Sequence, residues 1–184
     1  PRTDGGRPLM QVLAERHSSR EYSTEKLPAQ VLSDLLWAAF GINRPESGKR
    51  TAPSAVNWQE IDIYVATAEG LYLYDAKKHA LNRVLAEDIR AATGRQDFTA
   101  EAPVNLVYVA DFSRMGKASD EQKAFYSAAD AGFIGQNVYL YCASEGLATV
   151  VRGAVDKEAL AKTMKLGPEQ RVILAQTVGY PKAK

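Results

Sequence analysis

The chain has 184 residues, a formal net charge of +1 and 46% hydrophobic residues, which is typical of one globular domain over residues 1–184. Nearly balanced charge argues against a nucleic-acid partner, which would require a basic face or stripe. No apolar run approaches the roughly 20 residues of a membrane-spanning helix, and two histidines with one cysteine exclude a zinc site built from several such ligands.

The N-terminal part of the chain is expected to be mainly helical. Residues 1–8 are polar and contain glycine and proline, which predicts an arm, and apolar residues over 9–13 predict a short helix. Pro28 suits the first position of a second helix, in which the apolar residues of 31–40 form one buried stripe. We expect Gly41 to end this helix in the left-handed conformation.

The middle of the chain is expected to supply strands and one further helix. Residues 43–49 carry proline, serine and glycine, which predicts a loop. Strand-forming residues over 61–76 flank Glu69-Gly70 and predict a hairpin. Apolar residues over 81–89 predict a helix that ends near Gly94, and the continuous apolar run over 104–110 predicts a central strand.

The longest helix is predicted over residues 119–145, with Ser119 as its N-cap and Gly146 at its end. Small residues in its middle allow another helix to approach closely. Packing within the chain and a dimer interface would both account for them. They are Ala128, Ala131, Gly132 and Gly135.

The C-terminal part predicts a short helix and a last strand. Asp156 is expected to cap a helix that runs to Leu166-Gly167, and residues 172–178 are expected to form the final strand. Helices and strands therefore interleave around one sheet that the hairpin makes at least partly antiparallel. The predicted fold class is α+β, with a mixed, mainly antiparallel central sheet flanked by helices.

The first polar run that could carry chemistry extends from Arg16 to Tyr22. Arginine presents a planar fork that grips phosphate, and Ser18 supplies a short donor to the same group. A second cation, Arg20, lies two residues beyond Ser18 and would reach a different part of the same ligand. The alternative is a solvated polar loop ahead of the second helix.

Two later segments offer groups that suit a planar ligand. In the run from Ala52 to Gln59, a Pro53-Ser54 turn fixes the backbone and Asn57 provides a donor and an acceptor. The alternative is a capped turn that enters a strand. The glycine-bounded segment 146–153 lets backbone N–H groups approach a ligand closely, unless it is a simple helix-to-strand crossover.

In this order and context, the three segments resemble the nitroreductase superfamily over nearly the whole chain. The first is similar to its Arg-Arg/His-Ser-x-Arg/Lys-x-aromatic motif, the second to Pro-Ser-x-x-Asn-x-Gln and the third to Gly-Leu-Gly-Thr. The resemblance implies an FMN cofactor across a homodimer interface formed by the long helix, with the second segment supplied by the partner. The implied cofactor-binding residues are Arg16, His17, Ser18 and Arg20, then Pro53, Ser54, Ala55 and Asn57, then Val151, Arg152 and Gly153.

The resemblance further implies the chemistry. Hydride would pass from NADH or NADPH to the flavin N5 and on to a flat electrophile such as a nitroaromatic or a quinone, with no catalytic side chain. Residues 35–41 and 70–75 look most like the azoline-oxidase branch, which dehydrogenates thiazoline and oxazoline rings. A flavin-dependent dehydrogenase or oxidase of that kind, and a non-catalytic flavin-binding protein, remain alternatives.

Two departures from the family pattern stand out. Glu60-Ile61 replaces the common Pro-Trp after Gln59. Many members add a basic C-terminal extension to the phosphate site, whereas this chain stops at Lys184, which leaves Lys182, Lys49 and Arg50 as candidates to substitute.

The remaining candidates are weaker. His79 is expected at the surface or at a strand end, and Cys142 is expected to pack on the apolar side of the long helix. Because the chain begins at Pro1, we expect a preceding segment to have been removed, and the sequence leaves the cytoplasm and the periplasm both open.

Overall fold

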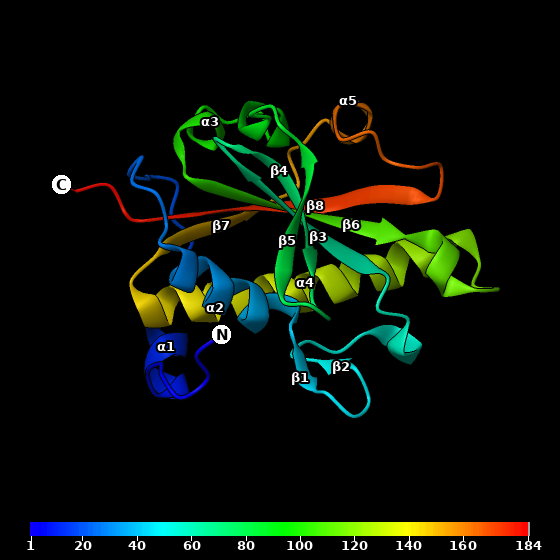
Figure 1. The fold of residues 1–184 in the computed structure, drawn as a ribbon, viewed down its shortest axis with the longest axis horizontal. Helices are drawn as coiled ribbons and strands as arrows, with labels where there is room; N and C mark the ends of the chain where they lie inside the picture. Colours follow the sequence, from blue (N-terminus) through cyan, green and yellow to red (C-terminus); the bar gives the residue numbers. More distant parts are fainter. Residues whose placement is uncertain (184) are drawn as a thin grey trace.

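The computed structural model describes residues 1–183, in which one six-stranded sheet lies between two helical layers (Figure 1). The strand order is β5-β4-β3-β6-β8-β7, and every adjacent pair is antiparallel. The strands are β3 (Ile61–Thr67), β4 (Gly70–Asp75), β5 (Ala80–Leu85), β6 (Val104–Asp111), β7 (Ala148–Arg152) and β8 (Gln170–Gly179). The expected α+β class is confirmed.

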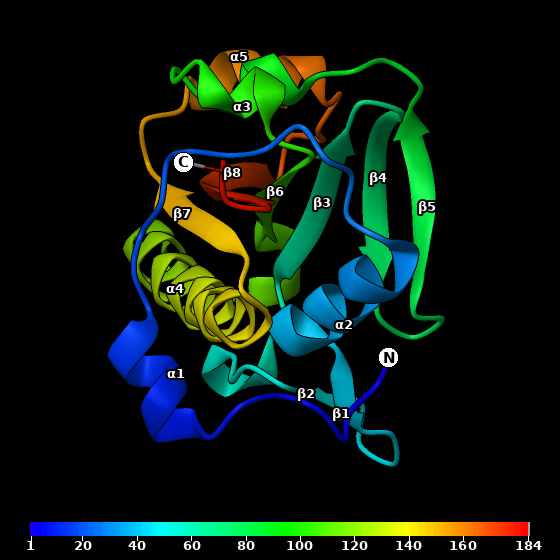
Figure 2. The same ribbon diagram turned by 90° about the vertical axis from the view of Figure 1, so that its left-hand side faces the viewer.

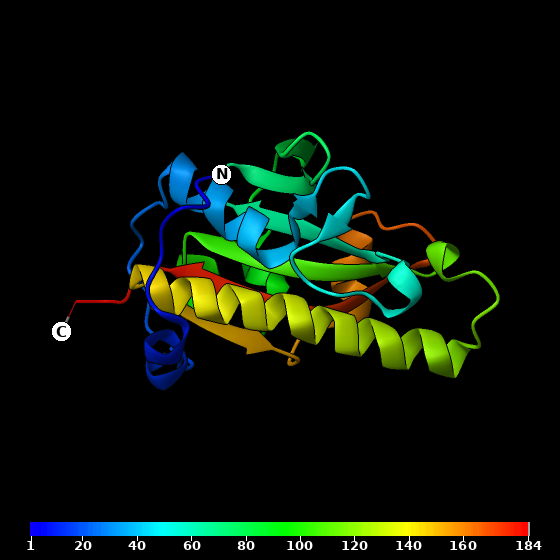
Figure 3. The same cartoon turned by 90° about the horizontal axis from the view of Figure 1, so that it is seen from below.

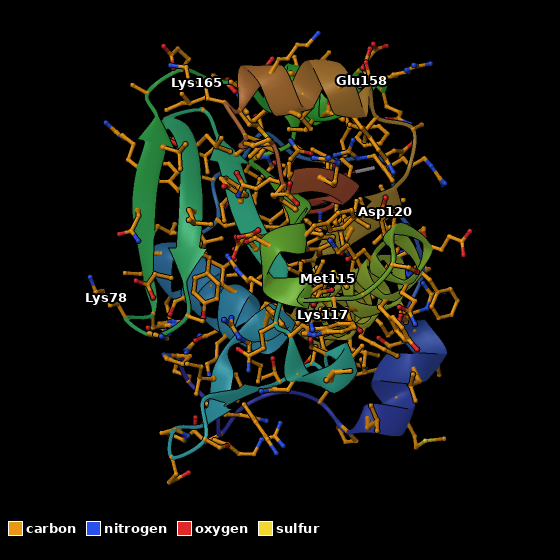
Figure 4. The ribbon with its side chains drawn as sticks, turned by 90° about the vertical axis from the view of Figure 1, so that its right-hand side faces the viewer. Lys78, Met115, Lys117, Asp120, Glu158 and Lys165 are labelled. Carbon is orange, nitrogen blue, oxygen red and sulfur yellow. The ribbon has the colours of Figure 1, made fainter. Side chains whose placement is uncertain are left out.

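The helices divide between the two faces of the sheet (Figure 2). One face carries α2 (Ala29–Phe40) and α4 (Asp120–Glu145), with α1 (Leu9–Glu15) beyond α4. The other carries α3 (Phe98–Glu101), α5 (Lys157–Thr163) and the short turn η2 (Arg90–Thr93). Figure 4 shows this division from the end where Asp120 begins α4, with Glu158 and Lys165 on the far side of the sheet.

The central strand β6 ties the two halves of the core together. Its residues are buried from Val104 to Ala110, because alternate side chains face the two helical layers. Leu106 and Tyr108 pack toward α2 and α4, whereas Val107 and Val109 pack toward α5. The continuous apolar run thus marks a strand covered on both faces, as the sequence predicts.

The long helix α4 follows its predicted signals closely. Ser119 accepts a hydrogen bond from the Gln122 N–H at 3.2 Å, and the Gln122 side chain accepts from the Ser119 N–H at 3.0 Å. This reciprocal capping box fixes the first turn. Gly146 ends the helix in the left-handed conformation, with φ of 69°. Cys142 is buried in the core, as expected.

The predicted helix over residues 81–94 is wrong, because the chain forms the edge strand β5 and then η2. β5 pairs with β4 in a register that joins Asp75 to Ala80. The intervening turn is built by the Asp75 carboxylate, which accepts hydrogen bonds from the Lys77 and Lys78 N–H groups. The bonds to β4 lie outside any local window, so the spacing of the apolar residues alone misled the assignment.

Two smaller expectations also fail. Gly41 is extended, with φ of −71° and ψ of 164°, because its carbonyl accepts the Thr51 N–H and the chain continues into a strand. The expected loop over residues 43–49 is partly a two-stranded ribbon of β1 (Ile42–Arg44) and β2 (Lys49–Arg50). Among the described residues, no helix has the length and the apolar character that crossing a membrane requires.

Two glycines with positive φ provide a test of the fold. A Cβ at Gly146 would meet nothing within 4 Å, whereas a Cβ at Gly70 (φ 138°) would lie 2.3 Å from the Leu85 carbonyl oxygen. We expect Gly146→Ala to lower the free energy of unfolding by about 1–2 kcal/mol through backbone strain alone. Gly70→Ala should lower it by more, because the β4–β5 ladder must also shift. Urea denaturation of both variants would contradict this reading if the two losses were equal.

Candidate functional site

The structure places the first polar run beside the edge strand β7, and so joins the first and third segments. The Ser19 N–H donates to the Thr149 carbonyl at 3.0 Å. Tyr22 anchors the end of the run, because its hydroxyl donates to the Ser19 carbonyl at 2.7 Å and its backbone bridges to Pro181. Residues separated by more than a hundred positions therefore line one edge of the sheet.

Tyr139 on α4 connects the two segments directly, although the sequence analysis did not single it out. Its hydroxyl lies 2.8 Å from Ser18 Oγ and accepts the Val151 N–H at 2.9 Å. The Arg16 guanidinium lies over the ring, 5.1 Å from its centroid. Arg16, Ser18 and Val151 thus converge on one phenol. The only sequence signal for this role of Tyr139 is that it follows the apolar residue Val138 on the predicted helix.

The basic side chains of the first run remain available to a ligand. Arg16 is half-buried, whereas His17, Ser18 and Arg20 are exposed. His17 Nδ1 lies 2.8 Å from the Glu15 carbonyl oxygen. Among residues 1–183, the carboxylates that form salt bridges pair with other cations, and neither Arg16 nor Arg20 is one of them. Two cations without a carboxylate partner therefore flank Ser18.

Arg152 differs from the other predicted arginines, because its side chain points into the protein. Its guanidinium donates to Thr177 Oγ1 at 3.0 Å, to the Thr93 carbonyl at 2.6 Å and to Asn105 Oδ1 at 3.0 Å. Burial among these neutral acceptors lowers the pKa of Arg152 to about 10. The side chain is engaged internally, so Arg152 can meet a ligand at this edge only through its main chain.

The second segment forms a loop around η1 (Ala55–Asn57), and this loop is anchored to α4 by hydrogen bonding. The Asp130 carboxylate accepts the Ala55 N–H at 2.9 Å, and Ser54 Oγ accepts the Gln59 N–H at 2.8 Å. Asn57 Oδ1 accepts a hydrogen bond from Gln59 Nε2 at 3.1 Å. The loop presents Pro53, Val56 and Asn57 to the outside.

A single chain does not bring the loop to the other two segments. The loop is anchored at Asp130 and the first run at Tyr139, which follows nine positions later on α4. At ~1.5 Å and ~100° per residue, the two anchors are about 13 Å apart along the helix and lie on opposite sides of it. Figure 3 shows the same separation, with the teal η1 turn and the blue α1 at different ends of α4.

The outer surfaces of α1 and α4 expose apolar side chains. Met10 and Phe125 are 76% and 68% exposed, and Leu9, Leu13 and Phe133 are exposed as well. The small residues of α4 are divided between two surroundings. Ala131 and Gly135 are buried within the chain, whereas Ala128 and Gly132 are exposed. Intrachain packing therefore explains only half of them.

Comparison with known proteins places this architecture in one family. The sequence profile of the Nitroreductase family matches residues 13–180. A relative from Methanocaldococcus jannaschii, named "Putative nitroreductase MJ1384", is 33% identical over 168 residues, which cover 86% of this chain and 84% of the relative. The crystal structure of a "putative nitroreductase" from Ralstonia eutropha JMP134 superposes with a TM-score of 0.96 at 45% identity, over 100% of this chain and 88% of that one.

More distant structures share the fold alone. The E. coli microcin synthetase McbBCD complex contains a chain with a TM-score of 0.78 at 20% identity, over 89% of this chain and 68% of that one. The NADPH:FMN oxidoreductase of Vibrio harveyi, complexed with NAD+, gives a TM-score of 0.72 at 18% identity, over 95% of this chain and 69% of that one.

The role of Tyr139 can be tested by removing its hydroxyl. We expect Tyr139→Phe to lower the free energy of unfolding by about 1 kcal/mol, because the Val151 N–H and Ser18 Oγ both lose a partner. Tyr126→Phe is the matched control, since Tyr126 lies on the same helix and its hydroxyl forms no hydrogen bond to the described residues. Equal urea midpoints for the two variants would show that the Tyr139 hydroxyl does not hold the segments together.

Proposed function

We infer, because this chain belongs to the nitroreductase family, that it is a flavin oxidoreductase whose cofactor is FMN. Its substrates are then NADH or NADPH as the hydride donor and a flat electrophile, such as a nitroaromatic or a quinone, as the acceptor. The observation that best supports this proposal is the convergence of Arg16, Ser18 and the main chain of Val151 at Tyr139.

The donor set at this edge suits the chemistry of FMN. A phosphate needs charge-assisted donors, and the Arg16 fork and the Ser18 hydroxyl lie together without a competing carboxylate. Arg20 is an exposed cation two residues further on, suited to the electron-rich pyrimidine edge of the ring. The Val151 N–H already donates to Tyr139, so the main chain beyond Val151, at Arg152 and Gly153, would complete the set at the end of β7.

The protein residues would bind and orient rather than transfer protons. When bound, FMN supplies a ring that accepts two electrons as hydride and passes them on. Arg16 and Ser18 would hold the phosphate, and Arg20 would stabilise negative charge on the ring. The C-terminal end of β7 would set the position of the N5 edge of the flavin through its backbone. No side-chain acid or base of this group is required by that scheme.

The second segment enters this proposal through a second copy of the chain. Pro53, Ser54, Ala55 and Asn57 lie on the far side of α4 from the phosphate donors, so they would close the site of the other subunit. The exposed apolar residues of α1 and α4 would then be buried between the copies. The proposed assembly is a homodimer with a flavin at each of two shared sites.

Absorption spectroscopy after FMN loading and gel filtration tests the proposal directly. Retained flavin at about one per chain, in a peak of dimer size, supports the cofactor and the assembly. Consumption of NADH or NADPH with a quinone or a nitroaromatic then supports the reductase activity. A flavin-dependent dehydrogenase or oxidase would consume reduced nicotinamide poorly, and a non-catalytic flavoprotein would show no turnover with any donor. Loss of all flavin from a protein saturated with FMN would contradict the proposal.

The assignment of the phosphate site predicts the effect of one substitution. Arg16→Ala should weaken FMN binding by about 1.5–3 kcal/mol, because a charge-assisted hydrogen bond is lost. Arg171→Ala is the matched control, since that arginine lies at the start of β8, away from this edge. Flavin fluorescence titration measures both affinities. Unchanged affinity in Arg16→Ala would remove Arg16 from the phosphate site.

Arg20 predicts an effect on the redox potential instead. Arg20→Ala should lower the midpoint potential of the bound flavin, because a cation near the pyrimidine edge stabilises the reduced, anionic ring. Its side chain is exposed and forms no salt bridge among the described residues, so the substitution should leave the fold unchanged. Potentiometric titration that finds the wild-type potential would show that Arg20 lies elsewhere.

A further inference from the structure

Two acidic side chains, Glu60 and Asp130, lie together beneath the loop of residues 54–59, where they accept hydrogen bonds from the consecutive residues Ser54 and Ala55. Glu60 is completely buried, at 0% exposure, and Asp130 is 2% exposed. Glu60 follows the loop at the entrance to β3, and Asp130 lies in the middle of α4. Glu60 is also the position at which this chain departs from the common Pro-Trp.

Hydrogen bonds to the described residues account for two of the four carboxyl oxygens of the pair. Glu60 Oε2 accepts from Ser54 Oγ at 3.3 Å, and Asp130 Oδ2 accepts from the Ala55 N–H at 2.9 Å. Glu60 Oε1 is buried and has no partner among the described residues. A buried carboxylate oxygen without a donor is costly, whereas a protonated carboxyl can donate.

No neighbouring cation neutralises the pair. The nearest arginines along the loop are Arg50, which donates to Gln59 Oε1, and Arg114, which donates to the Gln59 carbonyl. Arg114 also pairs with Asp62 and Asp111. No salt bridge among residues 1–183 includes Glu60 or Asp130.

The electrostatic consequence is that Glu60 resists ionisation beside Asp130. Burial raises the pKa of the Glu60 carboxyl, and the adjacent Asp130 carboxylate raises it further. A proton held between the two carboxyls would give the otherwise unpaired Glu60 Oε1 a hydrogen bond. The same arrangement keeps Asp130 as the acceptor for the Ala55 N–H.

The loop above the pair needs such an anchor. Val56, Asn57 and Gln59 have positive φ angles of 51°, 57° and 49°. Each of these conformations costs on the order of 1 kcal/mol in a residue other than glycine, so surrounding contacts must impose them. The contacts that do so run through Ser54 and Ala55 to Glu60 and Asp130.

We propose that Glu60 and Asp130 share one proton, and that this proton-bridged pair clamps residues 54–59 in the shape that closes the flavin site of the partner subunit. Both are positioning residues, and the inference rests on the proposed function for its link to FMN. When the shared proton is lost, two buried carboxylates repel each other and the clamp is released.

The direction of the pH dependence follows from the raised pKa of Glu60. The clamp is intact at pH values below the ordinary carboxyl pKa and is lost as the pH rises through the raised value. FMN affinity should therefore fall on the alkaline side. A loss of about tenfold corresponds to one pKa unit of coupling between the proton and the bound flavin.

The test is the FMN dissociation constant from about pH 5 to pH 9, a range that covers documented buried glutamates. In the wild type we expect affinity to fall by about tenfold or more across the titration of the pair. Glu60→Gln should bind FMN at low pH like the wild type and keep that affinity at high pH, because its amide donates to Asp130 and cannot ionise. Glu121→Gln, at an exposed carboxyl on the same helix, should retain the wild-type profile.

Two results would overturn the clamp: a Glu60→Gln profile that falls in parallel with the wild type, or lost FMN affinity at every pH in a folded Glu60→Gln protein. Infrared titration of the wild type without FMN tests the shared proton separately. A protonated carboxyl signal should persist at pH values above the ordinary carboxyl pKa, and its absence there would refute the proposal even if the variant failed to fold. If the wild type binds no FMN at any pH, the proposed function fails, whereas the infrared result still decides whether the proton is shared.

Discussion

The packing of α4 against the sheet is the constraint on which both halves of the candidate site depend. Ile134, Val138 and Cys142 bury one side of the helix against β3, β6 and their neighbours. With this side fixed, Asp130 and Tyr139 hold their segments at set positions on opposite sides of the same rod. Because both segments are anchored to this one helix, the nine positions between the anchors set the distance between them within one subunit.

Buried polar groups fix the edge strand with similar firmness. The Arg152 guanidinium binds Asn105 and Thr177, and the Thr177 hydroxyl donates to the same Asn105 oxygen at 2.6 Å. Next to it, Gln176 accepts from the Tyr108 hydroxyl at 2.6 Å and donates to Thr149 Oγ1. These bonds run across β6, β8 and β7. They hold the backbone of β7 in place, so this edge of the candidate site has a fixed geometry.

The sequence alone predicts those structural elements whose determinants are a few neighbouring residues. Ser119 and Gly146 mark α4 because capping depends on a few neighbouring residues. The polar runs could be identified as a set, but not the inward direction of Arg152, because its acceptors come from strands and turns far along the chain. Tyr139 and the Glu60–Asp130 pair were beyond reach for the same reason. The edge strand β5 was misassigned because only its pairing with β4 distinguishes it from a helix.

The chain carries a single thiol. Cys142 is fully buried in α4, and burial raises its pKa far above the ordinary value, so it offers almost no thiolate to a reagent. The folded surface is therefore naturally free of reactive cysteine. A single cysteine introduced on that surface would become the only labelling point in each subunit. Spin labels or fluorophores attached there would report the spacing between copies without any prior removal of the native residue.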